Sequence, residues 1–346
     1  MNAAERGVEV HVVLDAFGSA LMPKQWLERW EQAGIRFRFY NPSPNIFRFG
    51  SQILQRLHRK IVVVDGRIAL IGGINISKDQ IETSDEGSRL DFAAAVEGPL
   101  VSVIHLQCLN FHRRLEHQWF GFYKNLRHPQ GLGSGNSAGD AKAKYILRDN
   151  FKHRRNIEKA YWTAMENAKS EIILANAYFF PGTRFLRKIK QASRRGVKIS
   201  LILQGRSEYL LMKWATEGLY RSLLKWNVEL YEYQPRFLHA KVAVCDESWS
   251  TIGSCNLDPF SLYGNLEANI VVSDSKFSAE LYTQLSKCIA EDCKRVLKYE
   301  MNFFRRILVK VSFWLFRFLP KILRGVHRSA SSMTITRRQE DPVINQ

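Results

Sequence analysis

Two segments of the sequence repeat the same set of side chains that can act on a phosphate ester. Each contains a histidine, a lysine two residues later and an aspartate five residues after the lysine: His58, Lys60 and Asp65 in the first, and His239, Lys241 and Asp246 in the second. An imidazole can attack phosphorus or move a proton, and an ammonium group neutralises charge on phosphate oxygens. With two of each, one histidine can attack phosphorus while the other protonates the leaving oxygen, and the basic groups take the place of a metal.

The match extends beyond these residues. The offset of 181 residues between the two histidines also carries Gly72 onto Gly253 and Asn75 onto Asn256. The pattern H-x-K-x4-D-x6-G-[GS]-x-N therefore occurs twice without a gap, and we expect the two asparagines to bind non-bridging phosphate oxygens. A single histidine on a strand is more often structural, and a single lysine is more often solvated. A duplication that preserves the polar positions in register favours a functional site.

The apolar runs Ile61–Val64 and Val242–Val244 predict that each motif lies on a strand, with the histidine and lysine on the same face. If the two copies pack face to face, four basic groups converge on one pocket with approximate two-fold symmetry. Asp65 and Asp246 precede turns. They are counted among the catalytic candidates, although support of the turn and of the lysine is favoured over direct proton transfer.

The surroundings of the motifs repeat as well, for example Arg6–Val10 and Arg195–Ile199. Strands alternating with helices predict an α/β fold of two pseudo-symmetric sandwich domains. We expect domain 1 over residues 1–127, a linker rich in Gly, Ser and Ala over 128–144, and domain 2 over 145–298. A strand and two helices precede Gly196, but only six residues precede Gly7. This difference favours a chain that begins inside a longer protein over a domain that lacks its opening strand.

Lys and Arg total 51 and Asp and Glu total 33, which gives a net charge of +18. Such a charge favours an anionic partner, either a nucleic acid, a membrane face or a phosphorylated substrate, over a merely solubilising surface.

The five cysteines are odd in number and form no CxxC pair, which argues against a disulfide framework or a zinc site. No secretory signal opens the sequence, and no apolar stretch reaches the roughly 18 residues of a spanning helix.

The segment Met301–Arg324 combines many aromatic and aliphatic residues with basic ones. A basic face opposite an aromatic face predicts that residues 299–328 form an amphipathic helix in an anionic bilayer interface. A core helix packed on domain 2 is the alternative. Residues 329–346 have the composition of a disordered tail.

The doubled motif resembles the phospholipase D superfamily, and its context resembles the bacterial cardiolipin synthases of the B type. The resemblance is carried by LHRKIVVVDGRIALIGGINIS, ANAYFFPGTRFL and the run from FLHAKVAVCD to GNLEANIVV. It implies an active site at the interface of two phospholipase D-like domains, a phosphohistidine intermediate and no cofactor or metal. It also implies that an acidic residue on the following strand, Asp91 or Glu267, orients each histidine. The two copies differ where Ser77 stands in place of Asp258.

We therefore expect a cardiolipin synthase, a phosphatidyltransferase that uses phosphatidylglycerol as donor, acceptor or both. The alternatives are a phospholipase D-type hydrolase and a nucleic-acid phosphodiesterase of the same superfamily; a non-enzymatic binding module fits the intact motifs poorly. Apolar loops at Ser43–Arg56 and Tyr178–Gly182 favour transfer over hydrolysis, unless they simply pack on the core. The aromatic C-terminal segment predicts a phospholipid membrane as partner rather than nucleic acid, with the protein peripheral on the cytoplasmic side of a bacterial cell membrane.

Overall fold

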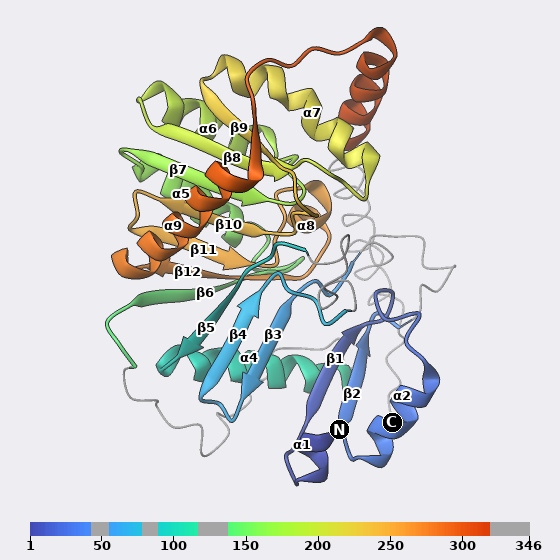
Figure 1. Ribbon diagram of the computed structural model, residues 1–346. Helices are drawn as coiled ribbons and strands as arrows, with labels where there is room; N and C mark the ends of the chain where they lie inside the picture. Colours follow the sequence, from blue (N-terminus) through green and yellow to red (C-terminus); the bar gives the residue numbers. More distant parts are fainter. Residues whose placement is uncertain (43–54, 78–88, 117–137, 319–346) are drawn as a thin grey trace, which may run out of the picture.

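A computed structural model describes residues 1–42, 55–77, 89–116 and 138–318 (Figure 1). Most of the predicted loop Ser43–Arg56, most of the predicted linker and the whole predicted tail lie outside these residues. The described part forms two α/β domains, which confirms the predicted fold class.

Domain 2 is built on one eight-stranded sheet in the order β13-β9-β8-β7-β10-β11-β12-β6, in which β7, β8 and β9 are parallel and the other pairs are antiparallel. The strands are β6 Lys142–Arg148, β7 Glu171–Asn176, β8 Lys198–Gln204, β9 Val228–Tyr233, β10 Lys241–Cys245, β11 Trp249–Gly253, β12 Glu267–Ser273 and β13 Cys293–Val296. Strand β6 begins inside the predicted linker and pairs along the whole of β12, so the predicted start of domain 2 at residue 145 is wrong.

Helices cover both faces of this sheet: α5 Asn156–Asn167, α6 Thr183–Arg194, α7 Leu210–Lys225, the short α8 Pro259–Tyr263 and α9 Ser275–Asp292. The alternation along the strands explains the two layers. In β7, Ile172 and Leu174 pack with α5, α6 and α7, whereas Ile173 and Ala175 pack with α9. The result is one sheet with a large core on one side and a smaller core on the other.

Domain 1 contains α1 Asn2–Glu5, β1 His11–Asp15, α2 Lys24–Gln32, β2 Arg36–Tyr40, β3 Lys60–Val64, β4 Ile68–Gly72, β5 Ala93–Glu97 and α4 Pro99–Glu116. Its strands form two separate sheets, a parallel pair β1-β2 and an antiparallel β3-β4-β5. In domain 2, β7 lies between β8 and β10 and pairs with both. The counterparts of β8 and β10 in domain 1 are β1 and β3. Within the described residues no strand pairs with both of them. Val62 and Val64 of β3 are exposed, whereas Ala243 and Cys245 of β10 are buried.

The two domains meet along strands that follow the motifs. Ala69 and Ile71 of β4 share a hydrophobic cluster with Ile270 and Val272 of β12, and α4 closes this cluster. Figure 1 shows β4 running toward the β12 end of the domain 2 sheet and β5 running back from it to the start of α4. This packing holds β4 of domain 1 against β12 of domain 2.

The helix over residues 303–318 packs on α7 of domain 2 by one side only. Val309 and Phe316 are buried, and an added Cβ at Gly218 of α7 would lie 2.8 Å from the Phe313 ring. The opposite side remains apolar and exposed, as shown by Phe304, Leu308, Val311 and Leu315. The sequence left two alternatives for this segment, a helix in a membrane interface and a core helix. One side of the helix packs on domain 2, as a core helix would, and the other side presents an exposed apolar surface.

Candidate active site

Four backbone hydrogen bonds between the domains bring the two motifs together in a pseudo-symmetric way. Leu57, just before His58, forms a parallel bridge with Leu266, and Leu238, just before His239, forms one with Leu90. The His58 amide donates to the Leu266 carbonyl at 3.0 Å, and the His239 amide donates to the Leu90 carbonyl at 2.8 Å. The remaining two run from Leu266 to the Arg56 carbonyl at 2.8 Å and from Leu90 to the Phe237 carbonyl at 3.0 Å. Each histidine is therefore placed beside the residue that precedes an acidic group of the other domain.

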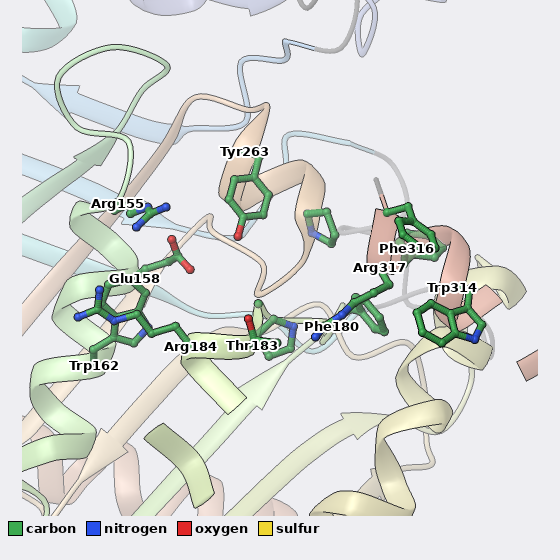
Figure 2. Close-up of a pocket in the computed structure, with 14 residues that line it drawn as sticks. Arg155, Glu158, Trp162, Phe180, Thr183, Arg184, Tyr263, Trp314, Phe316 and Arg317 are labelled. Atoms are coloured by element: carbon green, nitrogen blue, oxygen red, sulfur yellow. The ribbon is translucent and has the colours of Figure 1, made fainter. Parts of the chain in front are cut away.

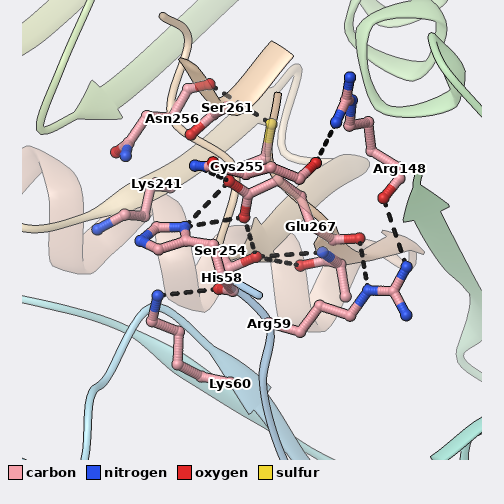
Figure 3. A network of polar contacts seen from close by, with 12 residues as sticks. His58, Arg59, Lys60, Arg148, Lys241, Ser254, Cys255, Asn256, Ser261 and Glu267 are labelled. Atoms are coloured by element: carbon pink, nitrogen blue, oxygen red, sulfur yellow. Dashed lines mark hydrogen bonds and ion pairs between the residues drawn. The ribbon is translucent and has the colours of Figure 1, made fainter. Parts of the chain in front are cut away.

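The carboxylates contact the histidines across the domain interface. His58 Nδ1 donates to the Glu267 carboxylate, with Oε2 at 2.9 Å and Oε1 at 3.0 Å (Figure 3). His239 Nδ1 donates to Asp91 Oδ2 at 2.6 Å. Asp91 and Glu267 thus occupy the predicted orienting positions, but each serves the histidine of the opposite copy. With Nδ1 engaged, Nε2 is the ring nitrogen left to react.

The supports of the two carboxylates differ, and the difference explains the alternation of Gly and Ser in the motif. Ser254 Oγ donates to Glu267 Oε2 at 2.5 Å. Its counterpart Gly73 has no such group, and a Cβ there would lie 2.3 Å from Asp91 Oδ1. Asp91 Oδ1 instead accepts from the Phe92 amide at 2.8 Å. The sequence shows the substitution, but only the packing shows that the serine serves one carboxylate and the glycine makes room for the other.

Both motif lysines lie beside the histidines. Lys60 Nζ donates to the His58 carbonyl at 2.9 Å, and the fully buried Lys241 donates to the His239 carbonyl and lies 3.8 Å from Asp91 Oδ2. Burial lowers the pKa of Lys60 to about 7 and that of Lys241 to about 8. The charge of Lys241 lowers the pKa of His58, and that of Lys60 lowers the pKa of His239. The two motifs, which the sequence predicted to face each other, lie close together across the domain interface, since each histidine contacts a carboxylate of the opposite copy.

The pKa values of both histidines lie below the usual value of an imidazole. Burial lowers the pKa of His58 despite the opposing charge of Glu267, and burial together with Lys241 lowers the pKa of His239 to about 4. Burial alone would raise the pKa of Glu267, but the His58 charge and hydrogen bond outweigh it and lower that pKa. A neutral imidazole next to an ionised carboxylate is the form that can attack phosphorus.

The two asparagines end up in unequal positions. Asn256 follows β11, is buried, and its Oδ1 has no hydrogen-bond partner within the described part of the chain. Figure 3 shows its side chain on the same side of the network as Lys241. Asn75 is half-buried. A buried amide oxygen without a partner is suited to accept a hydrogen bond from a substrate hydroxyl.

Asp65 and Asp246 lie at the opposite ends of their strands from the lysines. The Asp246 carboxylate accepts hydrogen bonds from the backbone amides of Lys169, Ser170 and Glu171 at 2.7 to 2.9 Å. Asp65 and Asp246 both have positive φ, as a tight turn after a strand requires. Asp246 therefore fixes the start of β7, which argues against the catalytic role and the support of the lysine expected for it, and Asp65 occupies the corresponding turn of domain 1.

Several residues near the centre carried no recognisable signal in the sequence. Asp258, noted only as a difference from Ser77, caps α8 through the Phe260 amide at 2.7 Å and the Ser261 amide at 3.0 Å. Burial raises its pKa to about 7.

Of the aromatic residues in the loop Tyr178–Gly182, Phe179 and Phe180 are buried in the domain 2 core. This loop therefore matches the alternative of core packing. No group of three or more potential metal ligands occurs among the described residues.

Comparison with known proteins identifies the family of this chain. The family described as cardiolipin synthase, PLD-like domain, matches residues 1–89 and 161–289. Cardiolipin synthase B of Escherichia coli strain K12 is 40% identical over 299 residues, covering 86% of this chain and 71% of the relative. Cardiolipin synthase B of Salmonella typhimurium strain LT2 is 40% identical over 301 residues, with the same coverage.

A solved structure shows the same fold at much lower identity. The crystal structure of phosphatidylserine synthase from Haemophilus influenzae Rd KW20 superposes with a TM-score of 0.67. It covers 96% of this chain and 84% of its own, at 13% sequence identity. At that identity the likeness concerns the fold alone.

Proposed function

The chain belongs to the family of cardiolipin synthases with phospholipase D-like domains, and from this premise we propose that it transfers a phosphatidyl group between two phospholipids through a phosphohistidine. The observation that carries the proposal is the pair of crossed contacts, His58 to Glu267 and His239 to Asp91. They leave two reactive Nε2 atoms in one centre with Lys60 and Lys241.

In the first step, Nε2 of one neutral histidine attacks the phosphorus of phosphatidylglycerol. The bond from phosphorus to the headgroup oxygen breaks. The other histidine, which takes up a proton at Nε2 when the anionic phosphate enters the site, gives that proton to the departing glycerol. Lys60 and Lys241 neutralise the non-bridging oxygens, and the Asn256 amide adds a hydrogen bond to the phosphoryl group. The products of this step are a phosphatidyl–histidine and free glycerol.

In the second step, the headgroup hydroxyl of another phosphatidylglycerol replaces the histidine. The histidine that acted as acid now takes the proton from this hydroxyl, the new oxygen–phosphorus bond forms and the nitrogen–phosphorus bond breaks. Cardiolipin leaves, and both imidazoles return to their starting state. The carboxylates hold Nδ1–H throughout, which keeps each ring in one orientation and stabilises the transient imidazolium.

The protein is proposed to act as a peripheral protein on the cytoplasmic side of an anionic phospholipid membrane, without nucleic acid as a partner. The apolar side of helix 303–318 and the net charge of +18 support this placement. None of the helices in the described ranges has the length and hydrophobicity needed to cross a bilayer.

Product analysis on phosphatidylglycerol vesicles tests the proposal. Wild-type protein should give cardiolipin and glycerol in equal amounts, with phosphatidic acid as a minor product. His58→Ala and His239→Ala should each reduce turnover by at least about 10³-fold, whereas His153→Ala, which alters a histidine outside the centre, should not. Phosphatidic acid as the main product would indicate a hydrolase, and DNA cleavage lost in His239→Ala would indicate a nuclease.

A further inference from the structure

A cavity lies between α5, the start of α6, α8 and helix 303–318 (Figure 2). Its volume is about 520 Å³, which is within the range of small-ligand sites. None of the four motif residues that carry the proposed reaction lines it. The cavity therefore needs an explanation other than the transfer centre itself.

The charge of the cavity walls favours an anion. Arg155, Arg184 and Arg317 line it together with one carboxylate, Glu158, so that the lining carries a net formal charge of +2. The Arg184 guanidinium lies 4.2 Å from the centre of the Trp162 ring, which fixes its orientation. Guanidinium groups bind phosphate through paired hydrogen bonds. An ionised phosphate diester matches the positive charge of this lining.

Two further sets of donors belong to residues that line the same cavity. Helix α6 begins at Thr183 with Gly182 as its N-cap, and no side chain caps it, so amides of its first turn are open to a ligand in the cavity. Trp162 is only 5% exposed, and its Nε1–H has no hydrogen-bond partner within the described residues. A buried indole donor without a partner is unfavourable, and a bound acceptor removes that cost.

The wall formed by helix 303–318, which also carries Arg317, is mostly aromatic and leads to the protein surface. Phe180, Trp314 and Phe318 lie on this side, and the rings of Trp314 and Phe318 stack with centroids 5.6 Å apart. Figure 2 shows Trp314 and Phe316 on the helix at the far side of the cavity from Arg155 and Glu158. Trp314 continues into the exposed apolar side that includes Val311 and Leu315. A free phosphate ion would leave this wall unused, but the acyl chains of a lipid would cover it.

We propose that this cavity binds the headgroup of a glycerophospholipid that is not the one reacting at the histidines. The phosphate contacts Arg184, Arg317 and the first turn of α6, and the acyl chains lie along Trp314 and the exposed side of helix 303–318. This site goes beyond the proposed transfer reaction, because it holds a lipid without converting it.

The cavity is placed to influence the reaction centre. The Phe180 amide donates to the Leu257 carbonyl at 2.7 Å, and Leu257 directly follows Asn256. Pro259 and Tyr263 of α8 line the cavity, and α8 is capped by Asp258. One short segment therefore carries a proposed substrate ligand at one end and the wall of the lipid site at the other.

Binding of monomeric dihexanoyl phosphatidylglycerol to the full chain tests the inference, with calorimetry as the readout and turnover suppressed by His239→Ala in every sample. The double change Arg184→Ala/Arg317→Ala should weaken the binding of the lipid in the cavity at least about tenfold, because two charge-assisted contacts are lost. Binding of the lipid at the histidines should not change. The matched control Arg187→Ala, on the same helix but outside the cavity, should leave binding in the cavity unchanged.

A second variant blocks the cavity without removing charge. A Cβ at Gly182 would lie 3.2 Å from Tyr263 Oη, and the backbone there is extended, so Gly182→Val narrows the cavity while tolerating the local conformation. It should weaken the same binding. Unchanged binding in both variants would overturn the proposal, and equally tight binding of inorganic phosphate would replace the lipid by a free anion. Failure of cardiolipin synthesis in wild-type protein would instead count against the transfer proposal alone.

Discussion

Glu267 of the second domain holds His58 of the first, with its carboxylate 2.9 Å from His58 Nδ1. The contact is matched by Asp91 and His239 in the opposite direction. Each imidazole is therefore oriented only when the two domains are docked. The reaction centre belongs to the interface rather than to either domain.

Replacing Glu267 by Gln should slow turnover by about 10- to 100-fold, the usual effect of losing a charged partner behind a reactive imidazole. The amide retains the shape of the side chain but removes the charge that stabilises a protonated His58. The ratio of cardiolipin formed by Glu267→Gln to that formed by wild type, at saturating phosphatidylglycerol, measures the effect. Ser254→Ala is the matched control, because it removes a hydrogen bond to the same carboxylate and leaves the charge in place. A Glu267→Gln enzyme with wild-type turnover would contradict the role of the crossed pair.

Exchanging the Gly and Ser of the two motifs should have unequal effects. Gly73→Ser places a Cβ 2.3 Å from Asp91 Oδ1, so Asp91 must move away from His239, and turnover should fall by at least about tenfold. Ser254→Gly removes only a support of Glu267 and should cost less. Steady-state rates of the two variants, normalised to folded protein, make the comparison. Equal losses would show that the packing around Asp91 does not set its position.

The stability of the protein should fall as the pH is lowered from 6.5 toward 4. The unfolded chain binds a proton at His239 in this range, whereas the folded chain, with a pKa of about 4, does not. The contribution of His239 to the free energy of unfolding is fully present above pH 6.5, and about 3 kcal/mol of it is lost as the pH falls to 4. Denaturant titrations of wild type and His239→Asn at several pH values measure it, since the variant should lose this part of the pH dependence. His153→Asn serves as control, and an identical pH dependence in all three proteins would refute the assignment.

The exposed apolar side of helix 303–318 should govern attachment to membranes. The triple change Phe304→Ser/Leu308→Ser/Leu315→Ser should reduce co-sedimentation with anionic vesicles at least about tenfold, because three exposed apolar groups no longer enter the interface. The buried residues Val309 and Phe316 are untouched, so the thermal midpoint should stay close to that of wild type. Leu21→Ser, at an exposed leucine of domain 1, provides a control. Unchanged sedimentation of the triple variant would place the membrane surface elsewhere.

The sequence predicted the reactive side chains correctly as neighbours, because the spacing of His58 and Lys60 survives in a second copy. It could not predict that Glu267 serves His58. That contact depends on how β12 packs against β4, a tertiary relationship that no local pattern encodes. For the same reason the role of Ser254 was invisible, since it differs from Gly73 by one hydroxymethyl group whose partner lies on another strand.

Some elements were missed for local reasons. Strand β6 begins with Lys142 and Lys144, which read as a polar linker until their pairing with β12 is seen. Strand β13 is short and contains Lys294 and Arg295, so it lacks the apolar alternation that marks a strand. Both lie at the edges of the eight-stranded sheet, where one side of the strand needs no buried partner.

The most direct test of the account is to trap the covalent intermediate. Wild-type protein mixed with phosphatidylglycerol labelled in the phosphate should be quenched within one turnover, digested and analysed by mass spectrometry under alkaline conditions that preserve phosphohistidine. We expect an acid-labile phosphatidyl adduct on Nε2 of His58 or His239, formed at a rate no slower than cardiolipin synthesis. Steady cardiolipin production with no adduct on either histidine at any quench time would contradict it.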